Sequence, residues 1–166
     1  MSDRGRFVFF DEWRLAAPPD EVWAVLRDLT SWPEWWSSVR RVTRLAVGRT
    51  DSHEAWEFRF RTRLPYDMAF VTDLLVEDPE LRVDARVSGR VDGHGIFRVE
   101  PIDGGALVRF DWEVRPLVTW MRLASPVARP IFSWNHRSLM AEGAFGLARR
   151  LDTGLLASPV GMLLPA

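Results

Sequence analysis

The sequence contains neither cysteine nor lysine, and its apolar runs are short. Without cysteine the chain cannot form disulfides, thiolate metal sites or a cysteine nucleophile. No run approaches the roughly 18 apolar residues that cross a bilayer, so we expect no stable membrane insertion. The charged residues at the N-terminus are followed by no apolar segment of the signal-peptide type, which favours the cytoplasm.

Neither sign of charge is in large excess. The formal net charge is −1 and the pI is about 6.3, so we expect no general attraction to nucleic acid. The three histidines, His53, His94 and His136, do not have the spacing of a metal site. The sequence also lacks a Gly-x-Ser-x-Gly elbow and a lysine-bearing phosphate loop. We therefore expect neither a metal nor a cofactor.

Tryptophan, by contrast, is abundant, with nine among 166 residues. Each indole buries a large apolar area, so this number indicates either a heavy core or an aromatic-lined cavity. The length suits one domain and is too short for two. We expect a single domain over residues 1–154 and an apolar tail over residues 155–166 that packs on the domain or on a partner.

Alternation of apolar and polar residues predicts an antiparallel sheet of about seven strands. The first strand is expected near residues 6–17, and two short helices follow it near 19–29 and 31–36. The remaining strands are expected in segments separated by turn residues: 39–47, 56–61, 68–76, 81–88, 95–100 and 108–114.

Near the C-terminus the apolar period becomes that of a helix. One stripe at helical spacing contains Phe132, His136, Leu139, Met140, Gly143, Leu147 and Leu151. It predicts a long helix over about residues 130–151, which Pro130 either begins or kinks, after a shorter helix over 117–124. Gly143 and Gly146 permit close contact with the sheet or leave room for a pocket. We expect an α+β fold in which a curved sheet wraps this helix and leaves a gap.

Two segments carry a family resemblance. They are Ala17-Pro18-Pro19-Asp20-Glu21-Val22-Trp23 followed by Asp28, Trp32-Pro33 and Trp35-Trp36, and Asn135-His136-Arg137 followed by Met140, Gly143 and Leu147-Ala148-Arg149. Over roughly residues 5–152 the chain resembles the START/polyketide-cyclase-like superfamily, often called SRPBCC. The resemblance implies a helix-grip fold with a cavity for lipids, polyketides, sterols or other apolar molecules. Enzymes of this superfamily share no catalytic motif, so the resemblance transfers no catalytic residue.

The side chains expected to face inward are candidates for ligand binding. They are Trp56, Phe58, Met68, Phe70, Phe97, Phe110, Trp112, Phe132, His136 and Met140. Lining a cavity, they would offer large and adaptable apolar contact, whereas as plain core they would need no ligand. The resemblance places Trp32, Trp35 and Trp36 at the pocket mouth, where they form either a gate or a staple between a short helix and the sheet.

Three residues are candidates for catalytic proton transfer: His136, Asp11 and Tyr66. Histidine titrates near neutral pH, so His136 could exchange a proton with a carbonyl-bearing ligand; alternatively it is a core histidine bonded to backbone or to a carboxylate. Asp11 shares the parity of the aromatic residues in the first strand and would lie among them. The alternative is that Glu12 and Arg14 face inward, or that the strand contains a bulge. Tyr66 is the only tyrosine and a candidate hydroxyl donor.

These observations leave three functional hypotheses. The first is binding or transport of a hydrophobic or aromatic small molecule, lipid- or polyketide-like, in an internal cavity; a volume on the order of 300 Å³ or more would support this hypothesis and the second. The second is a cofactor-independent polyketide cyclase, aromatase or dehydratase. The third is an interaction module with a filled interior, whose apolar tail docks on a protein partner. Solid packing of Phe110, Trp112 and Met140 would contradict the first hypothesis. A homodimer is left open by the sequence.

Overall fold

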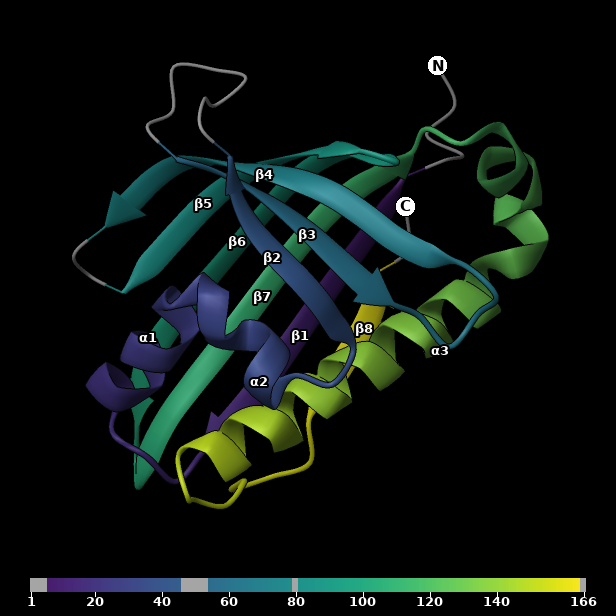
Figure 1. The fold of residues 1–166 in the computed structure, drawn as a ribbon. Helices are drawn as coiled ribbons and strands as arrows, with labels where there is room; N and C mark the ends of the chain where they lie inside the picture. Colours follow the sequence, from purple (N-terminus) through teal and green to yellow (C-terminus); the bar gives the residue numbers. More distant parts are fainter. Residues whose placement is uncertain (1–5, 46–53, 79–80, 165–166) are drawn as a thin grey trace.

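A strongly bent antiparallel sheet and one long helix make up most of the fold (Figure 1). The computed structural model describes residues 6–45, 54–78 and 81–164, without the side chains of residues 75–78, 120–127 and 164. The strands are β1 (Phe7–Leu15), β2 (Val39–Leu45), β3 (Ala55–Arg61), β4 (Asp67–Asp78), β5 (Arg82–Gly89), β6 (Val91–Ile102), β7 (Gly105–Pro116) and β8 (Val160–Leu164). They form one sheet in the order β2-β3-β4-β5-β6-β7-β1-β8.

Short helices separate β1 from β2, and a long one follows β7. They are α1 (Pro19–Arg27), a 3₁₀ helix η1 (Leu29–Ser31), α2 (Trp32–Trp35) and α3 (Thr119–Arg150). Proline at the start of α1 and the carboxylates of Asp20 and Glu21 in its first turn explain why a helix begins directly after β1. Figure 1 shows α3 along the open side of the bent sheet, with α2 beside it. Among the described residues, no helix is long and apolar enough to cross a membrane.

The predicted α+β architecture is confirmed, but the sheet has eight described strands instead of about seven. The additional strand, β8, comes from the segment expected to be an apolar tail. It pairs antiparallel with β1, so that Asp11 lies opposite Gly161 and Glu12 opposite Val160. Without β8, the backbone N–H and C=O groups on this side of β1 would form an open sheet edge.

The helical region is one continuous element and not two. The prediction of a short helix over 117–124 separate from a long one is wrong, since α3 runs through both Pro126 and Pro130. A proline inside a helix removes one backbone hydrogen bond and crowds the carbonyl four residues earlier, which bends a helix without necessarily ending it. Figure 1 shows α3 changing direction in its N-terminal third, where these prolines lie.

The core occupies one end of the interior. The inward residues of β1 alternate with half-buried ones, as the parity of the sequence predicts. Trp13 and Leu15, at the end of β1, are fully buried against α1 and the C-terminal half of α3. The rest of the interior, under the middle of α3 from Phe132 to Met140, is not filled by side chains, and the candidate site lies there.

The side chain of Glu142 connects α3 to two neighbouring loops, one before β2 and one between β3 and β4. Its carboxylate accepts hydrogen bonds from the hydroxyls of Ser37 and Ser38, and it pairs with the Arg63 guanidinium at 2.6 Å. Burial raises the pKa of the Glu142 carboxyl, but the hydrogen bonds from Ser38, Ser37 and Arg63 outweigh burial, so that the pKa is lowered overall. The ionised form therefore contributes to holding α3 in place.

We expect Glu142→Gln to lower the free energy of unfolding by about 1–3 kcal/mol at about pH 7, because its donors lose a charged acceptor. The stabilisation is present above the unfolded pKa near 4.5 and is lost as the pH falls through the lower folded value. Urea unfolding at about pH 7 and about pH 3 measures this difference. An equal loss at both pH values would contradict the prediction.

The control variant is Glu34→Gln. Glu34 lies 3.8 Å from Arg150, and its side chain is 64% exposed. An exposed ion pair of this kind contributes little, so we expect a change below about 0.5 kcal/mol at either pH.

Candidate ligand-binding site

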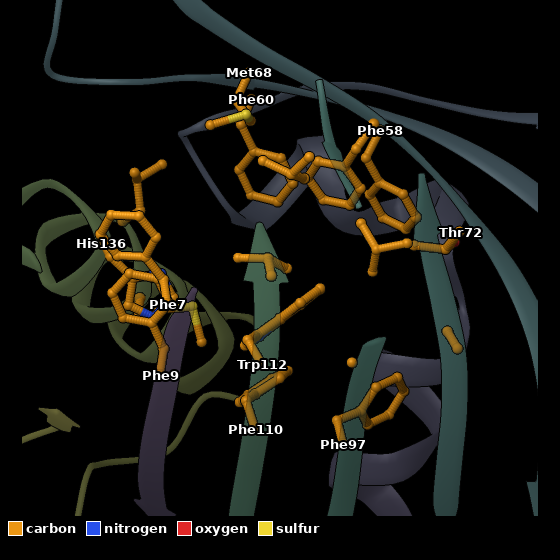
Figure 2. A pocket seen from close by; sticks show the side chains of 18 of the residues that line it. Phe7, Phe9, Phe58, Phe60, Met68, Thr72, Phe97, Phe110, Trp112 and His136 are labelled. Carbon is orange, nitrogen blue, oxygen red and sulfur yellow. The ribbon is translucent and has the colours of Figure 1, made fainter. Parts of the chain in front are cut away.

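A cavity of about 220 Å³ lies between the inner face of the sheet and α3 (Figure 2). Aromatic residues form a large part of its wall: Phe7, Phe9, Trp32, Trp36, Phe58, Phe60, Tyr66, Phe70, Phe97, Phe110, Trp112 and Phe132. Aliphatic side chains from β4, β5, β6 and β7, from η1 and from α3 contribute the rest of the lining, together with a few polar groups. The volume is smaller than the expected 300 Å³, but the interior is open and not filled.

The aromatic wall is built by cross-strand stacking. The rings of Phe58 and Phe70, on neighbouring strands, are stacked with centroids 5.5 Å apart, and Phe97 and Phe110 lie 5.8 Å apart. Opposite Trp112 the sequence has Gly95, where an added Cβ would lie 2.9 Å from the indole ring. Because the glycine has no side chain, the indole can lie flat against β6. These contacts hold the rings in the wall and leave the centre open.

Most of the predicted ligand-binding residues line this cavity. Those that do are Phe58, Met68, Phe70, Phe97, Phe110, Trp112, Phe132, His136 and Met140. Trp56 does not line it. This residue is buried in the core cluster, where its indole N–H lies 3.4 Å from Glu54 and the Arg44 guanidinium lies 5.8 Å from its ring. Trp56 has the inward parity of Phe58, but the cavity does not extend that far along β3.

The tryptophans of the short helices are fixed in place. Trp32 and Trp36 line the cavity, whereas Trp35 lies in the core beside them. The indole N–H of Trp32 donates to the Leu26 carbonyl at 2.9 Å, and that of Trp36 donates to the Leu139 carbonyl at 2.9 Å. All three side chains are buried. These anchors favour a staple between α2 and its neighbours over a movable gate.

Two of the three catalytic candidates meet at the wall of the cavity. The Nε2 atom of His136 lies 2.6 Å from Oδ2 of Asp11, which is fully buried. The His136 ring also stacks on Phe9, with centroids 3.9 Å apart. The second oxygen of Asp11, Oδ1, is enclosed without a hydrogen-bond partner in the described chain. It lies beside Gly161 of β8, where an added Cβ would be 2.6 Å away.

This pair leaves one imidazole nitrogen available. A carboxylate only accepts hydrogen bonds, so Nε2 of His136 donates to Asp11. The Nδ1 atom has no partner among the described residues, and it is not fully enclosed. It can accept a hydrogen bond when the imidazole is neutral and donate one when the ring is protonated. Asp11 thus fixes the orientation of a group that can exchange a proton with a molecule in the cavity.

Tyr66, the third candidate, also lines the cavity. Burial raises the pKa of its phenol, so the hydroxyl keeps its proton and remains a hydrogen-bond donor at neutral pH. His94 lies on β6 outside the cavity lining, and His53 lies outside the described residues. Within the described ranges, no group of three histidine or acidic side chains is arranged to hold a metal ion.

Sequence reasoning missed several lining residues. Phe7 and Phe9 contribute to the wall, and Asn135 lies beside His136 at the same end of the cavity. Thr72 was also missed, although it shares the parity of the inward residues of β4 and is only 7% exposed. A polar residue at an inward strand position was the available signal.

Comparisons with known proteins agree with this geometry. Residues 11–152 match the family described as polyketide cyclase / dehydrase and lipid transport. No curated protein sequence matches the chain significantly. A START superfamily protein from Mycobacterium smegmatis has a similar structure, with a TM-score of 0.68 and 13% identity, over 87% of this chain and 99% of that chain.

Two aromatase/cyclase structures are also similar. For the Zhui aromatase/cyclase from Streptomyces sp. R1128 the TM-score is 0.65 at 14% identity, over 88% of this chain and 96% of that chain. For StfQ, a di-domain ARO/CYC from the steffimycin biosynthetic pathway, it is 0.62 at 14% identity, over 90% of this chain but only 53% of that chain. This chain therefore spans about half the length of StfQ. Such low identities show a shared fold, whereas the family match covers most of the sequence. The chain belongs to the polyketide cyclase/dehydrase and lipid transport family.

Proposed function

We propose that this protein binds a compact hydrophobic molecule with aromatic rings in the cavity between the sheet and α3. The observation that carries the proposal is the wall itself, in which aromatic and aliphatic side chains surround about 220 Å³ of open space. Phe110, Trp112 and Met140 border this space instead of filling it, as a ligand-binding interior requires. The family description, which includes lipid transport and polyketide cyclisation, supports a ligand of this chemistry.

The cavity volume limits the size of the ligand. Pockets for drug-sized molecules begin at about 300 Å³, whereas an apolar cavity of about 150 Å³ accommodates benzene. A volume of about 220 Å³ lies between these values. It suits a molecule of about two fused rings, and a longer ligand would require the walls to move apart. Naphthalene is therefore a suitable probe molecule.

Filling the cavity should abolish most of this binding. Ala85 lines the cavity from β5, so Ala85→Phe places a ring inside it. If the ring displaces about 100 Å² of ligand contact, the loss is about 2.5 kcal/mol, which raises the Kd for naphthalene about fiftyfold or more. Titration followed by tryptophan fluorescence measures the Kd, because Trp36 and Trp112 lie in the wall.

The matched control is Arg86→Phe. It places the same ring on the next residue of β5, which is exposed on the other face of the sheet. We expect this variant to bind naphthalene within about twofold of the original protein, since the cavity is unchanged. No binding by the original protein, or equal binding by Ala85→Phe, would contradict the proposed function.

A second function is supported by one specific observation, the contact of 2.6 Å between Asp11 and His136 at the cavity wall. We infer that His136 transfers a proton to or from a ketone bound in the cavity. Asp11 positions the imidazole and stabilises its protonated form, as a carboxylate does for histidine in many acid–base sites. The aromatase/cyclase names of two structural neighbours favour polyketide-like ketones as substrates.

A further inference from the structure

Two polar groups in the cavity wall lack hydrogen-bond partners within the described chain and are not fully enclosed, so a ligand can reach them. One is the hydroxyl of Thr72 on β4. This residue is 7% exposed, yet its hydroxyl has no partner, and its oxygen keeps some accessible surface. The other is Nδ1 of His136, whose second nitrogen is occupied by Asp11. Both residues line the cavity.

The indole N–H of Trp112 also lacks a partner within the described chain, but it is fully enclosed, so a ligand in the cavity does not reach it. The remaining polar side chains of the lining have partners. The Thr62 hydroxyl lies 2.6 Å from the Tyr66 carbonyl, to which it donates, and Tyr66 itself has an interaction. The side-chain oxygen of Asn135 accepts from the Arg63 backbone N–H at 2.9 Å. Asn135 directly precedes His136 in α3, so any amide N–H that it offers to the cavity adds to the polar end that His136 already forms. Polar recognition therefore concentrates at His136 and at Thr72.

These two groups lie far apart across the cavity. Figure 2 shows His136 beside Phe9 on one side of the open space and Thr72 on the opposite side. Between them stand the aromatic walls, with Phe58 on one side and Phe110 on the other. The site thus has a polar group at each end and an apolar middle.

A hydroxyl enclosed by apolar side chains is unfavourable unless it forms a hydrogen bond. The Thr72 hydroxyl can donate or accept, and Nδ1 of His136 can accept or donate according to its protonation. An oxygen atom of a ligand at each end, as hydroxyl or carbonyl, would therefore satisfy both groups. An apolar ligand would leave both without a partner, and part of the gain from its burial would be lost.

We propose that the cavity selects a compact, flat aromatic molecule with a hydroxyl or carbonyl oxygen at each end, a proposal that rests on the proposed function. One oxygen bonds to Nδ1 of His136 and the other to the Thr72 hydroxyl, while the rings contact the aromatic walls. Thr72 is a specificity residue in this arrangement. The ligand class is that of dioxygenated bicyclic aromatics.

The test compares 2,6-dihydroxynaphthalene with naphthalene on the original protein and on Thr72→Val, which preserves the shape of the side chain. We expect the substitution to weaken binding of the diol about five- to tenfold and to change naphthalene binding less than about twofold, because only the diol loses a hydrogen bond. The control is Thr43→Val, on β2, whose neighbour Val42 packs on the core. It should change neither affinity.

The hydrogen bond at the His136 end of the cavity is tested by the ¹⁵N resonance of His136 Nδ1, which is assigned with the help of a His94→Gln variant. We expect it to shift on addition of the diol and to change little with naphthalene. The two-ended site is wrong if Thr72→Val binds the diol as tightly as the original protein does, or if the His136 resonance responds equally to both compounds. Naphthalene binding by the original protein would in that case still support the proposed hydrophobic cavity. If neither compound binds the original protein, the proposed function fails as well.

Discussion

Replacing Gly146 by alanine should lower the free energy of unfolding by about 2–4 kcal/mol, even though alanine is the better helix former by about 1 kcal/mol. An added Cβ would lie 1.9 Å from the backbone carbonyl oxygen of Trp35. That oxygen belongs to α2 and cannot rotate away as a side chain can. To admit the methyl group, α3 must move away from α2 and from the tryptophans packed there.

Urea unfolding of Gly146→Ala measures this effect, with Gly154→Ala as the matched control. At Gly154 an added Cβ meets no atom within 4 Å, so we expect a change of less than about 0.5 kcal/mol. If Gly146→Ala is as stable as the control, the close contact between α3 and α2 is not what holds the helix over the cavity.

Replacing His136 by glutamine should slow proton transfer in the cavity by about a hundredfold or more, the size of a general-base contribution. The substrate for this test is 2-tetralone, a bicyclic ketone with acidic C–H bonds next to its carbonyl. In D₂O, neutral His136 would remove one of these protons, and the enolate would take a deuteron from solvent. Deuterium incorporation is measured by mass spectrometry.

Glutamine is chosen because its amide can still donate to Asp11, so the buried carboxylate keeps a partner. Naphthalene binding by the variant checks that the cavity is intact. If His136→Gln incorporates deuterium as fast as the original protein, His136 is not the base. If the original protein does not accelerate incorporation at all, the cavity binds ligands without acid–base chemistry on ketones.

The main architecture follows from short-range patterns in the sequence. The parity of Phe7, Phe9 and Trp13 correctly predicts which face of β1 is inward, because each side chain of a strand alternates with its neighbours. The same parity places Asp11 inside, as the structure shows. The stripe containing His136 and Met140 likewise predicts the face of α3 that meets the cavity.

Features that depend on distant parts of the chain were not predictable in this way. Asp11 and His136 are 125 positions apart, and no local pattern pairs them. Gly146 was expected to permit contact with the sheet or to leave room for a pocket, whereas its close neighbour is Trp35 of α2. Along β3 the cavity reaches Phe58 but not Trp56, although both side chains have the inward parity. The parity of a strand predicts which face a side chain is on, but it does not predict how far along the strand a cavity extends.

The most direct test of the account is a crystal structure of the protein with naphthalene. We expect electron density for the ligand inside the cavity, between Phe58 and Phe110 and within contact distance of Met140. Density only on the surface, or an interior in which these three side chains close on one another and leave no space, would contradict the central claim that the sheet and α3 enclose a hydrophobic ligand.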